Sequence, residues 1–264
     1  MSTNEQTEIE RKYDVDAEAV VPDLARVSTV ADPAGGAGPV VEVARVERAA
    51  PDHLRAVYHD TEDHLLLGSR ITLRRRTGGH DEGWHLKLPA SAPASASGSA
   101  SSGQEMSSDA PATTGTDHSA AGATAGEPDG STRGRREVHA PLGSEDEGVP
   151  AELLARVAEQ LGDRSVAPVV VLETTRTATT LLDAEGAALA ELADDVVTAT
   201  VSGREGAEPV VRRWREWEAE LAPGVDGPSG DALLDAIETR LLAAGAVPST
   251  SRSKLARGLG AEPA

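Results

Sequence analysis

The stretch TEIERKYDV (residues 7–15) decides the fold, because apolar and charged residues alternate along it. Successive side chains of a β-strand point to opposite faces, so the alternation predicts a strand. Glu8, Glu10 and Lys12 would share one face, and Ile9 would begin the other. The charged face carries both signs, so it is either the solvated side of a sheet or part of a site.

The same alternation recurs in stretches that lie far apart in the chain. They are ITLRRR (71–76), WHLKLP (84–89), RREVHAPL (135–142) and EWEAEL (216–221). The commonest cause is an antiparallel sheet with one buried face and one solvated face. Here, however, single strands are almost purely acidic or almost purely basic on the charged face, and such segregation costs repulsion unless opposite charges lie nearby. Charged faces that point inward across a closed barrel would bring the two signs together.

Composition excludes several classes of function. A formal net charge of -19 argues against binding of duplex nucleic acid, which needs a basic surface. Aromatic residues make up 2% of the chain, which leaves little material for stacking bases. The chain has no Cys, so a metal would be held by oxygen or imidazole ligands. Because no apolar run is long enough for a signal peptide or a membrane span, we expect a soluble cytoplasmic protein.

Turn-rich segments separate the elements that we expect. The predicted strands are residues 7–15, 40–46, 54–60, 70–76, 83–88, 135–142, 169–182, 187–192, 196–201 and 213–221. Apolar spacing and terminal glycines predict helices at 150–161 and 231–244. Residues 90–132 consist mostly of Ala, Ser, Gly, Thr and Pro, which predicts a disordered insertion. The fold class is thus expected to be α+β, with a sheet or barrel as its main structure.

The charged strands carry the residue types that phosphoryl chemistry needs. Carboxylates bind hard divalent cations such as Mg²⁺ and Mn²⁺. Guanidinium groups match phosphate oxygens with two parallel hydrogen bonds. A metal held by carboxylates beside a cradle of Arg and Lys therefore predicts a site for a phosphate-rich anion.

A series of motifs follows the opening strand in a definite order. After Glu8, Glu10 and Lys12, an E-x-E-x-K, come YHDTED (58–63), LRRR (73–76), WHLK (84–87), RRE (135–137), Arg176, ELADD (191–195), EAE (218–220) and SRSK (251–254). This order resembles that of the CYTH domain family, the triphosphate tunnel metalloenzymes, which include class IV adenylate cyclases and thiamine triphosphatases. The resemblance covers nearly the whole chain outside residues 90–132, and all three lysines of the chain fall on matching positions.

The resemblance implies an α+β fold in which an eight-stranded antiparallel β-barrel forms a tunnel. Flanking helices would lie outside the tunnel, and the disordered low-complexity insertion at residues 90–132 would lengthen one loop. It implies a single CYTH-like domain over residues 1–258, followed by a tail at residues 259–264.

The resemblance also implies a role for each matching residue. The metal ligands, for Mg²⁺ or Mn²⁺, would be Glu8, Glu10, Asp194, Glu218 and Glu220. The phosphate-binding residues would be Lys12, Arg74, Arg76, Lys87, Arg135, Arg176 and Lys254. The catalytic residues would be Glu218, Glu137 and Lys87. The sequence does not decide whether Asp194 or Asp195 faces the tunnel, and single histidines such as His85 are expected to be packed or surface residues.

The leading hypothesis is a metal-dependent hydrolase of inorganic triphosphate or of a triphosphate-bearing small molecule, acting by attack of a metal-bound water. Some family members instead cyclise ATP to cyclic AMP, with the ribose hydroxyl as nucleophile. A third possibility is a module that binds triphosphate or polyphosphate without catalysis, and a fourth is an ordinary sheet with a wet face and no site. The expected partner is a small molecule rather than duplex nucleic acid or a membrane.

Overall fold

The computed structural model describes residues 4–29, 40–89, 135–144, 147–202 and 208–261, which belong to one compact unit. Its strands are β1 (Asn4–Glu8), β2 (Glu10–Val15), β3 (Arg45–Arg48), β4 (Asp52–Asp60), β5 (Thr72–Thr77), β6 (Gly83–Leu88), β7 (Arg135–Ala140), β8 (Ala167–Leu182), β9 (Ala188–Val201), β10 (Val210–Leu221) and β11 (Val247–Pro248). Its helices are α1 (Leu65–Gly68), α2 (Ala151–Arg156), α3 (Ala158–Leu161), α4 (Gly227–Ala243) and α5 (Lys254–Leu259). The fold is therefore mainly β with few helices, where an α+β chain with a sheet or barrel as its main structure was expected.

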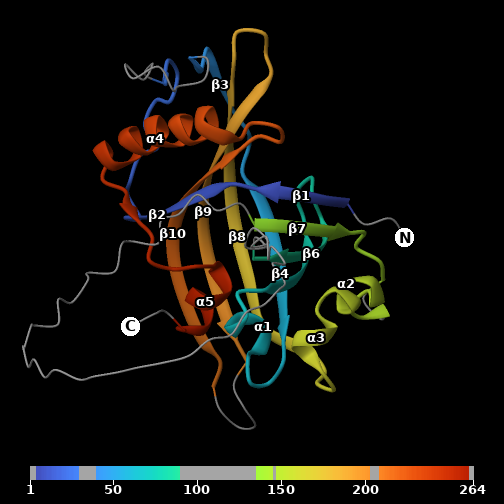
Figure 1. Cartoon of the computed structure of the whole chain (residues 1–264). Helices are drawn as coiled ribbons and strands as arrows, with labels where there is room; N and C mark the ends of the chain where they lie inside the picture. Colours follow the sequence, from blue (N-terminus) through green and yellow to red (C-terminus); the bar gives the residue numbers. More distant parts are fainter. Residues whose placement is uncertain (1–3, 30–39, 90–134, 145–146, 203–207, 262–264) are drawn as a thin grey trace, which may run out of the picture. The chain divides into compact units, whose positions relative to one another are not determined.

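The strands form one curled antiparallel sheet (Figure 1). The strand order is β1-β7-β6-β5-β4-β8-β9-β10-β2-β11, and β3 pairs with β8 beside this path. β1 and β2 are consecutive pieces of the N-terminal strand, separated at Ile9, whose carbonyl accepts a hydrogen bond of 2.9 Å from Leu221 N–H. β1 pairs with β7 and β2 with β10, so the N-terminal strand contacts strands from both ends of the curled path.

The outer face of the sheet packs against helices. Tyr13 and Trp217 are buried there against the apolar face of α4, which includes Leu233, Leu234 and Ile237. A second apolar group on the outer face of β5, β6 and β7 is covered by α2 and α3. Because the apolar positions of these strands are occupied by helices on the outside, the alternating charged positions face the inside of the curl.

Helix α5 lies against the inner face of the sheet. Leu255 is fully buried against Leu172, which shares a strand face with the charged Arg176 further along β8. A Cβ on Gly258 would lie 3.2 Å from Ala199 Cβ and 3.3 Å from Val170 Cγ1, so the helix backbone approaches the strands closely. One end of the inner face is thus apolar and covered by α5, and the charged part lies beyond it.

The bounds of the elements differ from the predicted ones in a few places. The predicted strands at residues 187–192 and 196–201 form one strand, β9, and the predicted helix at residues 150–161 is broken at Val157 (φ -122°) into α2 and α3. The short elements α1, β11 and α5 were not predicted. The predicted insertion at residues 90–132 lies outside the described residues, as do residues 262–264 of the predicted tail. Among the described helices none is long and apolar enough to span a membrane.

Candidate functional site

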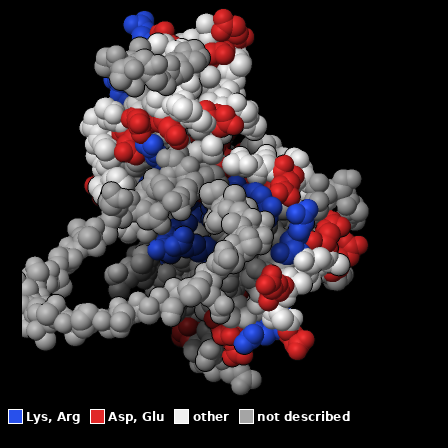
Figure 2. Space-filling view, in the orientation of Figure 1, with Lys and Arg blue, Asp and Glu red and all other residues white. Residues whose placement is uncertain are grey.

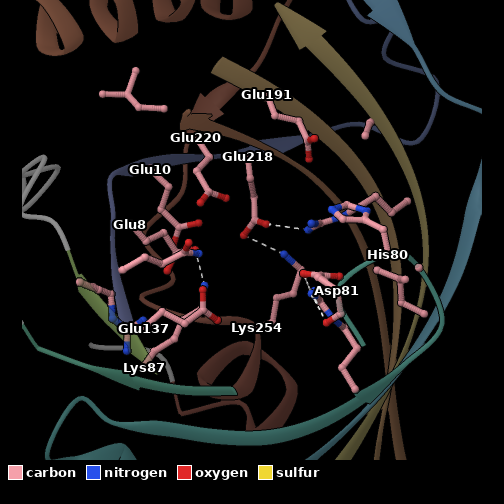
Figure 3. Close-up of a pocket in the computed structure, with 18 of the residues that line it drawn as sticks. Glu8, Glu10, His80, Asp81, Lys87, Glu137, Glu191, Glu218, Glu220 and Lys254 are labelled. Atoms are coloured by element: carbon pink, nitrogen blue, oxygen red, sulfur yellow. Dashed lines mark hydrogen bonds and ion pairs between the residues drawn. The ribbon is translucent and has the colours of Figure 1, made fainter. Parts of the chain in front are cut away.

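The inner face of the curled sheet lines a cavity of about 510 Å³ (Figure 3). Its lining includes every residue for which the sequence predicted a role, except Asp194. These are Glu8, Glu10, Lys12, Arg74, Arg76, Lys87, Arg135, Glu137, Arg176, Glu218, Glu220 and Lys254. The structure therefore brings together side chains from strands that are far apart in sequence, although their roles stay predictions. Figure 2 shows Lys and Arg gathered near the centre of one face of the molecule, with acidic side chains around them.

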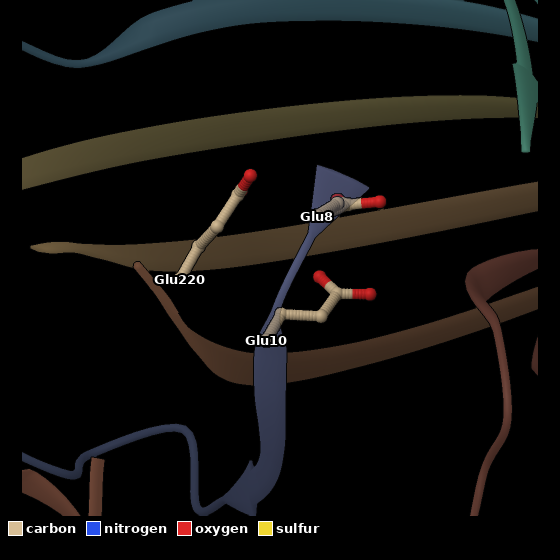
Figure 4. A group of neighbouring side chains, drawn as sticks. All are labelled: Glu8, Glu10 and Glu220. Carbon is tan, nitrogen blue, oxygen red and sulfur yellow. The ribbon is translucent and has the colours of Figure 1, made fainter. Parts of the chain in front are cut away.

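Three carboxylates meet where the first and last long strands pair. Glu10 on β2 is the register partner of Glu220 on β10, and Glu8 lies two residues away on β1 (Figure 4). Each of the three offers an oxygen within 4.8 Å of those of the other two. The second oxygen of Glu8, Oε2, is buried without a hydrogen-bond partner. Burial and the neighbouring carboxylates of Glu8 and Glu10 raise the pKa of Glu220 to about 8.

These observations fit a hard divalent cation. A cation between the three carboxylates would give the buried oxygen of Glu8 a partner. It would also stabilise the ionised form of Glu220, which the other two carboxylates disfavour. Oxygen-only donors of this number suit Mg²⁺ or Mn²⁺, which take a few protein carboxylates and leave room for other ligands. Glu8, Glu10 and Glu220 are accordingly the candidate metal ligands of the chain.

A second acidic group, Asp195, Glu216 and Glu218, lies deeper and is already neutralised. Lys254 Nζ lies 3.0 Å from Asp195, 2.5 Å from Glu216 and 2.7 Å from Glu218. Arg176 donates two hydrogen bonds to Asp195, of 2.8 and 2.6 Å, and one of 3.0 Å to Glu218. Burial alone would raise the pKa of Glu218, but Lys12, Lys254 and Arg176 hold it well below the usual range. With several cations in contact, this group needs a metal less than the first one does.

The structure separates the two adjacent aspartates that the sequence left unresolved. Asp194 accepts hydrogen bonds from Arg215 at 2.8 and 2.9 Å and from the Trp217 indole at 3.1 Å, on the outer face of the sheet. Asp195 is fully buried on the inner face. Adjacent residues of a strand point to opposite sides, so the prediction of Asp194 as a metal ligand is corrected. Asp195 is the acid that lies on the inner face, with Glu216 and Glu218.

Two lysines of the cavity pair with the first carboxylate group. Lys87 pairs with Glu8, and Lys12 pairs with Glu10 at 2.8 Å and also with Glu218. Arg74 donates to the Tyr58 hydroxyl at 3.2 Å, and although burial alone would raise the pKa of Tyr58, Arg74 lowers it.

The two arginines on the inner face of β5 retain capacity to bind an anion. The Nε atoms of Arg74 and Arg76 are buried without a hydrogen-bond partner. Buried guanidinium groups with an unused donor, side by side on one strand face, are suited to bind phosphate oxygens.

Sequence reasoning missed several residues of the site. His85 was expected to be a packed or surface residue, but its Nδ1 lies 2.9 Å from Glu137 Oε1 and its Nε2 lies 2.9 Å from the Asp81 carbonyl oxygen. Its position two residues before Lys87, on the same face of β6, was the available signal. Asp81 itself lies in a turn, where pattern gives no direction for a side chain.

Three kinds of comparison place the chain among known proteins. The model of the CYTH domain matches residues 6–209. The uncharacterized proteins MT2285 and Rv2226 of two Mycobacterium tuberculosis strains are each 38% identical over 260 residues. The match covers 96% of this chain and 40% of each of those proteins, so the chain spans well under half the length of these relatives.

Two solved structures are also similar. One is bh2851 from Bacillus halodurans, described as a candidate adenylate cyclase, with 15% identity, a TM-score of 0.45 and coverage of 96% of this chain and 97% of the other. The other is HpAC1 from Hippeastrum, described as having a dominant triphosphatase activity, with 14% identity, a TM-score of 0.44 and coverage of 97% of both chains. The family predicted from the motifs is confirmed by the domain match, and the chain belongs to the CYTH domain family.

Proposed function

We propose that the chain is a metal-dependent triphosphate hydrolase that acts inside a closed tunnel, on inorganic triphosphate or on a small molecule that bears a triphosphate. One observation carries the proposal: the carboxylate group Glu8–Glu10–Glu220 and the cations Lys12, Lys87, Arg74 and Arg176 line the same cavity. Carboxylates repel a phosphate chain unless a cation lies between them, so a metal and a triphosphate together fit this lining better than either does alone.

The strand pairing supports an eight-stranded tunnel. If β1 and β2 are counted as one strand, this strand and β4 to β10 form a ring in which each member pairs with two neighbours. β3 and β11 are additions outside the ring. We take residues 1–258 as one such domain, with residues 90–132 as an insertion in the connection between β6 and β7.

Glu8, Glu10 and Glu220 would hold the metal. Glu218 would contribute to the site through its ion pair with Lys12. When bound, Mg²⁺ or Mn²⁺ would neutralise and polarise the phosphate oxygens. The residues of the chain do the rest. Lys12, Lys87, Arg74, Arg76, Arg135 and Arg176 would bind and orient the phosphate groups, whereas Lys254 is enclosed by three carboxylates and would mainly hold these in place.

Glu137, a lining residue of the cavity, would accept the proton of an attacking water. Burial alone would raise its pKa, but Lys87 and the hydrogen bond from His85 lower it, so the carboxylate is ionised. In the proposed reaction a water oxygen forms a bond to the terminal phosphorus, the bridging P–O bond breaks, and the water proton passes to Glu137. Lys87 would neutralise negative charge that develops on the phosphate oxygens beside its ammonium group.

The lining favours hydrolysis over cyclisation of ATP. Among the described lining residues the aromatic rings are those of Tyr58, whose hydroxyl contacts Arg74, and His80. The Tyr58 ring is buried within the apolar cluster beneath α5, and His80 lies on an exposed turn, so neither ring offers an open apolar face on which adenine would stack. Binding of a base without stacking is weak. Inorganic triphosphate needs no such surface.

An assay panel tests the proposal. The protein is offered tripolyphosphate, ATP and thiamine triphosphate with Mg²⁺ or Mn²⁺, and release of phosphate and of cyclic AMP is followed. We expect metal-dependent phosphate release from tripolyphosphate, lost in Glu10→Ala and weakened at least tenfold in Arg74→Ala. The matched control is Glu173→Ala, an exposed carboxylate on β8. Cyclic AMP as the main product would replace hydrolysis by cyclisation, and tight binding of tripolyphosphate without turnover would indicate a binding module.

A further inference from the structure

The hairpin between β5 and β6 reaches into the cavity with its tip. Gly79, His80 and Asp81 of this turn are among the lining residues (Figure 3). The carboxylate of Asp81 pairs with Arg76, a residue of the proposed phosphate cradle. The Arg76 side chain is 5% exposed and the Asp81 side chain 43% exposed, so the acid approaches the guanidinium group from the solvent side.

The environment of Arg76 favours a bound anion. Burial and the nearby guanidinium groups of Arg74 and Arg176 lower the pKa of Arg76. A carboxylate in contact opposes that shift by stabilising the charged form. Among the described residues, Asp81 is the acid that forms an ion pair with Arg76. A phosphate group that binds Arg76 would meet the same donors that the Asp81 carboxylate already uses.

The backbone of the turn is held independently of this carboxylate. Arg76 Nη2 donates to the Asp81 carbonyl at 3.3 Å, and His85 Nε2 lies 2.9 Å from the same oxygen. Gly78 has φ +82°, and a Cβ there would lie 2.2 Å from His53 O, so the turn is packed directly on β4. The Asp81 side chain can therefore turn toward solvent while the hairpin stays in place.

We propose that Asp81 is a specificity-determining residue: its carboxylate occupies the Arg76 end of the phosphate cradle, and a substrate must displace it. The inference rests on the proposed function and adds that the Asp81 carboxylate competes with the substrate for Arg76. A substrate with a high negative charge offsets the loss of the Asp81 contact, whereas a weakly charged phosphate compound does not.

The test compares two variants that remove the same charge from the same turn. Asp81→Asn removes the carboxylate that contacts Arg76. Glu82→Gln removes an exposed carboxylate whose contact is with Gly78 N–H at 3.4 Å. We expect Asp81→Asn to lower KM for tripolyphosphate by about three- to tenfold with little change in kcat, and Glu82→Gln to change neither by more than about twofold. In an Arg76→Gln background the gain from Asp81→Asn should vanish.

Each outcome bears on the inference. Equal effects of the two variants would show that only the overall charge of the β5–β6 turn matters, and would overturn the role of Asp81. So would a gain that persists in the Arg76→Gln background. Calorimetric binding of tripolyphosphate to the wild-type protein separates the two levels: if the wild type neither binds nor hydrolyses tripolyphosphate, the proposed function itself falls and the inference falls with it.

Discussion

The ammonium group of Lys254, the first residue of α5, lies 2.7 Å from the carboxylate of Glu218 on β10. The contact joins a short C-terminal helix to the middle of the site. Ser253 caps the same helix by accepting a hydrogen bond of 3.1 Å from Ala256 N–H. The helix covers the apolar end of the inner face, so this one side chain contributes both to the position of the helix and to the charge balance of the acidic group.

Replacement of Lys254 should therefore cost stability. Lys254→Met would leave Asp195, Glu216 and Glu218 with fewer cations in a buried place, and breaking a buried ion pair in this way costs about 3–5 kcal/mol. Urea denaturation checks the prediction. The matched control is Arg252→Met, an exposed cation two residues earlier, which should change the free energy of unfolding by less than about 0.5 kcal/mol. A Lys254→Met protein as stable as the control would mean that α5 is held by its apolar contacts alone.

Gly258 should be intolerant of a side chain. Gly258→Val would push against Ala199 and Val170 on two packed strands, where overpacking typically costs about 1–3 kcal/mol. The control is Gly68→Val at the end of α1, where a Cβ meets no atom within 4 Å. Thermal unfolding of both variants should show a clearly larger loss for Gly258. Comparable losses at the two positions would contradict the close approach of α5 to the sheet.

Glu220 should make the stability of the metal-free protein depend on pH in an unusual direction. Its pKa is raised to about 8 from the ordinary value of 4.5, so the folded protein holds a proton that the unfolded chain releases. The stability that this group contributes is fully present below pH 4.5 and is lost as the pH rises toward 8.

Glu220→Gln should flatten that dependence, as measured by Tm from pH 5 to 8 in the presence of a chelator. Glu191→Gln is the control, since Glu191 lines the same cavity beside Glu220 but is not one of the three clustered carboxylates. Binding of Mg²⁺ to the wild type should release a proton, because the metal competes with it for the carboxylate. Calorimetry in buffers of different ionisation enthalpy measures this proton, and its absence would argue against Glu220 as a ligand.

His85 should position Glu137 rather than take part in the reaction itself. His85→Ala removes the partner at 2.9 Å, and we expect kcat for tripolyphosphate to fall about tenfold while KM changes little. His85→Asn retains an N–H near the place of Nδ1 and should recover part of the loss. His53→Ala, an exposed histidine on β4, is the control. A loss in His85→Ala that Asn does not relieve would point to packing instead.

The sequence allowed most of the site to be predicted because one rule governs strands. Once Glu8, Glu10 and Lys12 are assigned to one face, alternation places Arg74 with Arg76 and Glu218 with Glu220 on the same kind of face. The strand at residues 83–88 has the bounds that were predicted. Alternation cannot decide which of two adjacent acids faces inward. Asp194 and Asp195 are distinguished by contacts with residues of other strands, such as Arg215 and Arg176.

Other features depend on contacts that no local pattern carries. The gap between the predicted strands at residues 187–192 and 196–201 contains two adjacent aspartates, but Arg176 and Lys254 neutralise Asp195 and the strand continues. α5 has six residues, too few to show a helical period, and is held by Lys254 and Ser253. Asp81 was unremarkable as a turn residue until the hairpin placed it on Arg76.

The split N-terminal strand has a consequence for the order in which this chain can fold. Glu8 and Glu10 lie on β1 and β2, which precede the other strands in the chain, whereas their partners in the sheet are β7 and β10, and Glu220 lies at the far end of β10. Pairings of such long sequence separation form late and slowly. The β2 part of this strand must therefore remain unpaired with β10 until residues 210–221 have left the ribosome, and the pairing of β2 with β10 brings Glu10 and Glu220 together in the same folding step.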